Sequence, residues 1–129
     1  MNSININTIC KIASGFSAQV IDHIEHSLDL NQYLITHPAA TFFVRAEGDS
    51  MRDVGILNDD LLVVDRSLIP QNNSIVIAII NGEFFVKRLK IVDGKGFLYT
   101  ANKYSQPIAV ADVDGLQFWG VVTHAIHAL

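Results

Sequence analysis

From Thr41 onward, the hydrophobic and polar positions follow a pattern typical of β-strands. Short runs rich in β-branched and aromatic residues alternate with Gly, Asn, Asp or Pro, which interrupt strands. The pattern predicts strands over Thr41–Ala46, Leu61–Asp65, Ser74–Ile80, Glu83–Ile91, Gly96–Ala101, Ile108–Val110 and Phe118–Ala128. We therefore expect a mainly β protein.

Three turns between these strands have recognisable residues. Asn81-Gly82 separates two apolar runs, and both residues tolerate the positive φ that a type I′ turn requires, so an antiparallel hairpin is predicted there. Asp93-Gly94-Lys95-Gly96 predicts a second, looser hairpin. Asp59, within Asn58-Asp59-Asp60, is expected to adopt a left-handed turn conformation.

The first part of the chain lacks this alternation. Apolar residues within Ser17–Leu28 stand at helical spacing, which predicts one short helix that ends at Asp29-Leu30-Asn31. We therefore divide the chain into an N-terminal arm, residues 1–36, and a β domain, residues 37–129.

Composition narrows the classes of function. Half of the 129 residues are hydrophobic, but the longest apolar runs, such as Ile75–Ile80, are far shorter than the roughly 18 residues of a membrane helix. The formal net charge of −4 provides no basic surface for phosphates, so direct DNA binding is not expected. The lone Cys10 and the lack of a secretory pattern at the N-terminus indicate a cytoplasmic protein.

Lys87 is the first candidate for chemistry. Strand alternation places it between Phe85 and Leu89 on one face of the predicted strand, while Arg88 points to the other face. Burial of a lysine favours the neutral amine, which can act as a base, whereas an arginine stays protonated. A solvated surface lysine is the commoner reading of such a position.

Ser50 is the second candidate. It stands in Gly48-Asp49-Ser50-Met51, directly after a predicted strand. A glycine at that place lets the backbone expose the serine hydroxyl and direct nearby N–H groups toward an oxyanion. Taken alone, a serine after a glycine at a strand end is usually only part of a turn.

The two segments together carry a resemblance. Glu47-Gly48-Asp49-Ser50-Met51 and Val86-Lys87-Arg88-Leu89 resemble the signature segments of the LexA/UmuD family of self-cleaving Ser-Lys peptidases (S24-type), especially its UmuD-like SOS mutagenesis members. The match is collinear and also includes Asp29-Leu30-Asn31-Gln32, His37-Pro38, Ala40-Thr41, Asp60-Leu61-Leu62, Val64-Asp65, Ile75-Val76-Ile77-Ala78, Gly82-Glu83-Phe84, Asn102, Pro107-Ile108 and Gly120-Val121-Val122.

This resemblance implies a mechanism and a substrate. Ser50 would be the nucleophile and Lys87 its general base, with Gly48, Asp49 and Met51 forming the nucleophile and oxyanion loop. UmuD-like proteins cut their own arm before a Gly-Phe pair, so the implied scissile bond is Ser14–Gly15. The family usually has Cys or Ala before that glycine, and the serine here is similarly small.

The resemblance also implies fold and partners. The expected fold is the LexA-like peptidase fold, a small, twisted, partly closed antiparallel β assembly with a flexible N-terminal arm and one short helix. The implied protein is a homodimer without cofactors that is triggered by the RecA filament. After cleavage it would regulate error-prone translesion synthesis with a UmuC-type Y-family DNA polymerase.

Other classes of protein fit the sequence less well. A LexA- or phage-type repressor needs a DNA-binding domain, for which the first 30 residues are too short and too poor in basic residues. A signal peptidase shares the chemistry but needs a membrane anchor, and a dyad-inactive binding module differs only in activity. The pairs His23/His26 and His124/His127 lack a neighbouring carboxylate or thiolate, so no metal site is expected. Phe118 and Trp119 are expected in the core or at an interface.

Overall fold

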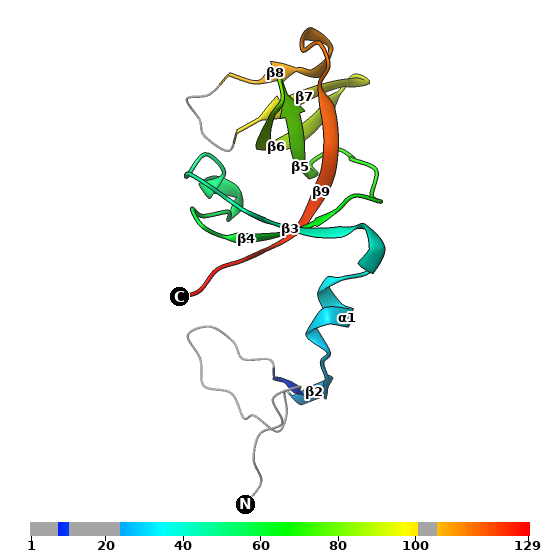
Figure 1. Ribbon diagram of the computed structural model, residues 1–129, viewed down its shortest axis with the longest axis vertical. Helices are drawn as coiled ribbons and strands as arrows, with labels where there is room; N and C mark the ends of the chain where they lie inside the picture. The colour runs from blue at the N-terminus through cyan, green and yellow to red at the C-terminus, as the bar shows by residue number, and fades with distance from the viewer. Residues whose placement is uncertain (1–7, 11–23, 101–105) are drawn as a thin grey trace, which may run out of the picture. The chain divides into compact units, whose positions relative to one another are not determined.

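The computed structural model describes residues 8–10, 24–100 and 106–129. The chain divides into two compact units, Met1–Thr36 and His37–Leu129. In the first unit, strand β1 (Thr8–Cys10) pairs antiparallel with β2 (Ile24–Ser27), and helix α1 (Leu30–Leu34) follows (Figure 1). The second unit contains the sheet that carries the candidate site.

The helix begins later than the sequence predicted. Residues 17–23 of the predicted helix lie outside the described residues, and Ile24–Ser27 forms a strand instead. Asp29 was expected to end a helix but caps one: its Oδ1 accepts the backbone N–H groups of Asn31 at 3.0 Å and Gln32 at 3.4 Å. An aspartate in extended conformation at this place stabilises a helix start, so the helix follows it.

The second unit is a seven-stranded antiparallel sheet with the strand order β3-β4-β9-β5-β6-β7-β8. Its strands are β3 (Thr41–Arg45), β4 (Leu61–Asp65), β5 (Ile75–Ile80), β6 (Glu83–Val92), β7 (Lys95–Tyr99), β8 (Ile108–Ala109) and β9 (Gln117–Ile126). Short 3₁₀ turns cover Pro38–Ala40, Arg52–Val54 and Val110–Asp112. The mainly antiparallel β class with one short helix is confirmed. The end strands β3 and β8 do not pair with each other, so the sheet is not closed.

Local turn signals account for the hairpins. Asn81 and Gly82 have φ values of 52° and 78° and join β5 to β6, as predicted. Asp93 and Gly94, with φ values of 51° and 75°, form an equally tight turn, because the next two residues already belong to β7. The expectation of a looser second hairpin was therefore wrong. Asp59 has the predicted left-handed conformation, with φ 72°.

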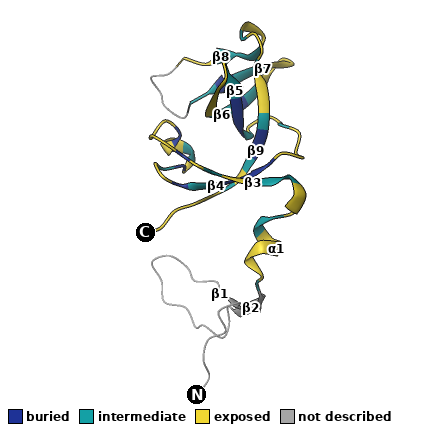
Figure 2. Ribbon diagram, viewed as in Figure 1, coloured by how far each residue is buried: buried dark blue, intermediate teal, exposed yellow. Residues whose placement is uncertain are grey.

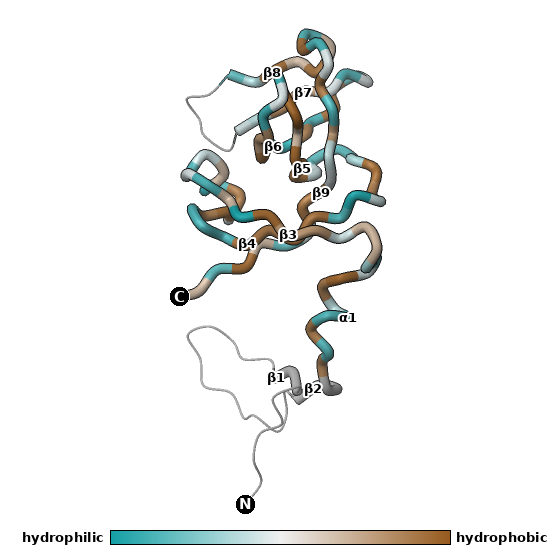
Figure 3. The backbone as a smooth tube through the Cα atoms, viewed as in Figure 1, coloured by the Kyte–Doolittle hydropathy of each residue, from teal (hydrophilic) through white to brown (hydrophobic). Residues whose placement is uncertain are grey.

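The core lies on both faces of β5. Ile77 packs in one cluster of buried residues, while Val76 and Ala78 pack in the other. The strand is brown in Figure 3 because it is continuously apolar, and part of it is dark blue in Figure 2 because Val76–Ala78 are buried. Each fully buried aliphatic side chain contributes about 1.5 to 3 kcal/mol relative to exposure. The middle of β5 is therefore anchored in the core on both of its faces.

Gly120 allows β9 to pass closely between β4 and β5. The register between β5 and β9 shifts just after Ile77, which pairs with Gly120. A Cβ atom on this glycine would lie 2.5 Å from Cγ1 of the buried Val64. A glycine inside a strand is typical of such bulges and close approaches.

A buried carboxylate, that of Asp65 at the end of β4, forms a hydrogen bond with His37 at the start of the second unit. Asp65 Oδ2 lies 2.6 Å from His37 Nδ1, and its Oδ1 accepts the backbone N–H and the hydroxyl of Ser67 at 2.8 and 2.6 Å. Burial raises the pKa of Asp65, but the hydrogen bonds from Ser67 and His37 outweigh it and hold the pKa below its ordinary value of 3.8. The ionised carboxylate therefore stabilises the fold.

Replacing Asp65 with asparagine is expected to lower the free energy of unfolding at pH 7 by about 1.5 to 3 kcal/mol, the usual worth of hydrogen bonds to a charged group. A lowered folded pKa stabilises the protein above the unfolded pKa, and this stabilisation is lost as pH falls through the folded pKa. Urea unfolding of both proteins should therefore show a difference that shrinks below about pH 4. A difference of equal size at acidic pH would assign the loss to packing instead.

Candidate active site

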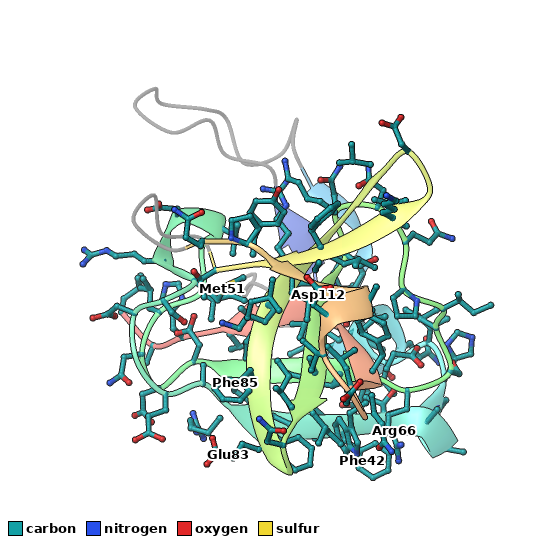
Figure 4. The ribbon with its side chains drawn as sticks, turned by 90° about the horizontal axis from the view of Figure 1, so that it is seen from above. Phe42, Met51, Arg66, Glu83, Phe85 and Asp112 are labelled. Atoms are coloured by element: carbon teal, nitrogen blue, oxygen red, sulfur yellow. The ribbon has the colours of Figure 1, made fainter. Side chains whose placement is uncertain are left out.

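One cavity of about 370 Å³ brings the two candidate residues together. It is bordered by the end of β3 and the loop after it, by β5, and by the first half of β6. Its lining residues are Val44, Arg45, Ala46, Glu47, Ser50, Ile77, Phe84, Phe85, Val86 and Lys87. Figure 4 labels Met51 in the loop after β3 and Phe85 on β6. Ser50 and Lys87, which are far apart in the sequence, thus share one cavity.

The loop after β3 presents Ser50 to solvent. Gly48 begins the turn with φ 87°, a conformation that strongly favours glycine. Met51 is only 2% exposed and packs in the core cluster that contains Ile77. Its carbonyl accepts the backbone N–H of Ile56 at 3.2 Å. Because the residue after it is anchored in the core, the exposed Ser50 lies on a loop of defined shape.

Asn58 is a residue of this loop region whose role the sequence analysis missed. Its Oδ1 accepts the backbone N–H of Gly48 at 2.7 Å. Gly48 therefore shapes the loop, and its N–H is already engaged by this side chain. The carbonyl of Asp49 accepts the N–H of Arg52 at 3.2 Å and starts the 3₁₀ turn. The available signal was the Asn58-Asp59 turn, because asparagine side chains often bond nearby backbone groups.

Lys87 reaches the cavity from a strand whose alternation was predicted correctly. It pairs with the buried Val76 of β5, and its Nζ lies 5.5 Å from the centroid of the Phe85 ring. Burial lowers the pKa of Lys87 below its ordinary value of 10.5. The neighbouring cation, Arg88, instead donates from Nη2 to Asn73 Oδ1 at 3.1 Å. Of these two adjacent cations, Lys87 is thus the one that lines the cavity.

The cavity lies beside an unpaired stretch of sheet edge. β6 pairs with β5 from Glu83 to Arg88, but β7 pairs only with Arg88–Val92. Within the described residues, the outer edge of Glu83–Lys87 therefore has no strand partner. Unpaired edges can bind an extended peptide through main-chain hydrogen bonds.

Comparison with known proteins gives the family. Residues 6–123 match the family described as Peptidase S24-like. The chain belongs to this family. It is 46% identical to protein ImpA of Salmonella typhimurium over 114 residues, which cover 88% of this chain and 77% of that protein. It is 41% identical to protein MucA of Escherichia coli over 118 residues, which cover 90% and 80% of the two chains.

A match to LexA repressor 1 of Pseudomonas syringae pv. tomato is 38% identical and covers 82% of this chain but only 52% of the repressor. The resemblance seen in the sequence is therefore confirmed at the level of the family. In general terms, the chain is a self-cleaving serine peptidase of the UmuD-like S24 group that acts in SOS mutagenesis.

The remaining predictions for this S24 peptidase concern the scissile bond, metal ligands and membrane-spanning helices. Ser14 and Gly15 lie outside the described residues. Within the described part, no group of three or more potential metal ligands occurs, and no helix is long and apolar enough to cross a membrane. A carboxylate does lie near one of the paired histidines, contrary to expectation: Asp60 Oδ1 is 3.4 Å from His127 Nδ1.

The two adjacent aromatic residues of β9 have different surroundings. Trp119 packs against a core cluster, and its ring lies 5.5 Å from that of Phe42 and 5.8 Å from that of Phe84. Phe118 remains 38% exposed. Of these two aromatic residues, Trp119 therefore packs against the core as expected.

Proposed function

We propose that Ser50 Oγ is the nucleophile and Lys87 Nζ the general base of a self-cleaving serine peptidase. The observation that carries this assignment is that both residues line one cavity, in which burial favours the neutral form of the lysine. A neutral amine beside a serine hydroxyl is the arrangement that Ser-Lys peptidases require. Membership of the S24 family supports the same assignment.

The chemistry follows from these two groups. Neutral Lys87 takes the proton of the Ser50 hydroxyl as the oxygen attacks the scissile carbonyl carbon. Backbone N–H groups of the loop around Ser50 stabilise the oxyanion of the tetrahedral intermediate. The lysine ammonium then donates its proton to the leaving amine, which breaks the peptide bond and leaves an acyl-enzyme. Lys87 next activates a water that hydrolyses the ester and restores both residues.

The substrate bond in this proposal is Ser14–Gly15, carried by an arm of residues 1–36 and cut by the domain of residues 37–129. A scissile carbonyl must come within about 3 to 3.5 Å of the attacking oxygen. Small residues on both sides of the bond favour that approach in a shallow cleft. The unpaired edge of β6 beside the cavity supports binding of the arm as an extended strand.

The biological role in this proposal follows the relatives. Similarity to ImpA and MucA supports a cytoplasmic homodimer that is cleaved in response to the RecA filament. The cleaved form would assist a UmuC-type Y-family polymerase in translesion synthesis. The net charge of −4 favours action through protein partners rather than direct DNA binding.

The proposed bond is tested by intact-mass spectrometry of the full chain, incubated at neutral and at alkaline pH, with and without an activated RecA filament. The expected result is loss of Met1–Ser14 and a product that begins at Gly15. Cleavage at another bond would move the scissile site, and the absence of any cleavage with the filament would favour a dyad-inactive binding module.

A further inference from the structure

We propose that Phe85 is a positioning residue for Lys87. The ring of Phe85 holds the Lys87 amine at the cavity and stabilises the ammonium that forms when Ser50 gives its proton to the lysine. This inference rests on the proposed function, because it assumes that Lys87 is the base. It adds a residue that neither signature segment contains. Phe85 does not touch the reacting bond in this role and acts only through Lys87.

The geometry comes from strand alternation. Phe85 and Lys87 are two residues apart on β6 and therefore project from the same face. They pair with Ala78 and Val76 of β5, both fully buried, so one side of the pair is firmly fixed. The Lys87 Nζ lies 5.5 Å from the ring centroid, within the roughly 6 Å at which a cation is attracted to an aromatic face. Both side chains line the cavity that contains Ser50.

An aromatic ring suits this task better than an acid would. A carboxylate beside Lys87 would hold the amine protonated and remove the base at neutral pH. A ring attracts the ammonium much more weakly and cannot itself titrate. The neutral amine can therefore persist before proton transfer, while the ammonium gains stabilisation once the reaction has produced it.

The charged groups around Lys87 are consistent with this division of roles. The end of β3 contributes Arg45 to the cavity lining, and the loop after it contributes Glu47. Glu83 lies on β6 two residues before Phe85 but is not a lining residue. Arg45 Nη1 donates to the Asp59 carbonyl at 3.0 Å. Among the described residues, no carboxylate lies within ion-pair distance of the Lys87 amine. The ring of Phe85 is the contact described for this amine.

The first test measures Lys87 without relying on cleavage. In the Ser50→Ala protein, which keeps the arm attached, lysines labelled with ¹³C at Cε are titrated by NMR, and the Lys87 signal is assigned by its loss in Lys87→Met. Phe85→Leu keeps apolar bulk over the amine but removes the ring face, so the pKa of Lys87 is expected to fall further. Phe85→Tyr keeps the ring face and should leave the pKa in place.

The second test measures cleavage in the protein with Ser50 intact. Phe85→Leu should lower the maximal rate at alkaline pH about two- to fivefold, the loss expected for a partly exposed cation–π contact. The pH at which the rate reaches half of its maximum should move down together with the Lys87 pKa. A residue that only fills space would lower the rate at every pH without shifting this midpoint.

A matched control exists on the same strand. Lys90 Nζ lies 5.9 Å from the ring of Tyr99, outside the cavity. Tyr99→Leu removes a similar contact and should change neither the Lys87 pKa nor the cleavage rate. Phe85→Met, checked for folding by circular dichroism, replaces Phe85→Leu if the leucine variant does not fold.

The outcomes separate this inference from the proposed function. A Lys87 pKa that is unchanged or raised in Phe85→Leu overturns the role of the ring, even if Ser50 and Lys87 prove catalytic. Cleavage that persists in Ser50→Ala overturns the proposed function, and the Phe85 ring then has no role in catalysis. The titration of Lys87 still decides whether the ring stabilises the ammonium.

Discussion

Replacing Ser50 with alanine is expected to abolish loss of the N-terminal segment and to leave the fold intact. Ser50 is exposed, and its side chain is not part of either core cluster, so removal of its hydroxyl should cost little stability. Its proposed role is to form the covalent bond to the scissile carbonyl, and no other group can replace it there. Loss of a serine nucleophile typically lowers the rate of cleavage by a factor on the order of 10⁶.

The measurement is intact mass after prolonged incubation at alkaline pH, with circular dichroism to verify folding. Ser67→Ala is the matched control. Ser67 is also exposed, but its hydroxyl bonds Asp65 and it does not line the cavity, so cleavage should continue in that variant. Cleavage of Ser50→Ala at the rate of the unmodified protein would remove Ser50 from the mechanism.

Replacing Lys87 with methionine should have two opposite effects: cleavage is lost, and the folded protein becomes more stable at neutral pH. Methionine keeps the apolar length of the lysine but cannot accept a proton, so self-cleavage should fall by a factor of at least about 10³. Burial lowers the pKa of Lys87, so the ammonium is less favourable in the folded protein than in the unfolded chain. Methionine removes that cost.

The sign of the pH dependence follows from linkage. Between the lowered folded pKa and the unfolded value, the unfolded chain binds more protons, so the stability of the unmodified protein rises with pH. The stability difference from Lys87→Met should therefore be greatest below the folded pKa and shrink as pH rises through it. Because the amine is only half-buried, the gain should stay below about 1 kcal/mol. Thermal unfolding at several pH values measures it.

Arg88→Met provides the control for this pair of effects. Arg88 is the adjacent cation on β6, but its guanidinium donates to Asn73 and lies outside the cavity lining. Its replacement should preserve cleavage and should not raise stability, because a hydrogen bond is lost. Normal cleavage in Lys87→Met, or an unchanged rate between neutral and alkaline pH in the unmodified protein, would contradict a lysine base.

A stabilising substitution that destroys activity is what a functional lysine in this environment implies. The cavity holds an amine whose burial costs stability, and the proposed reaction needs the neutral form that burial favours. A lysine on a solvated face would not cost the folded protein this stability, and its amine would be protonated at neutral pH. The cost to stability and the capacity for catalysis therefore have one cause.

Local physics made much of the fold predictable from the sequence. The alternation of apolar residues located the strands, and the Asn81-Gly82 turn defined one hairpin, because both signals depend only on neighbouring residues. The short helix was misplaced for the same reason. The apolar spacing before Asp29 favours a helix that ends there, whereas the side chain of Asp29 favours a helix that begins there. Only the structure showed that Asp29 caps the start of α1.

The sequence by itself determined which residues could do the chemistry: the resemblance and the strand pattern selected Ser50 and Lys87. Only the tertiary structure decided that they share a cavity, that Asn58 holds the Gly48 N–H, and that the Phe85 ring lies against the lysine amine. The physical reason is that strand order and register, together with the side-chain packing that depends on them, arise from contacts between distant parts of the chain. Local sequence preferences do not encode such contacts.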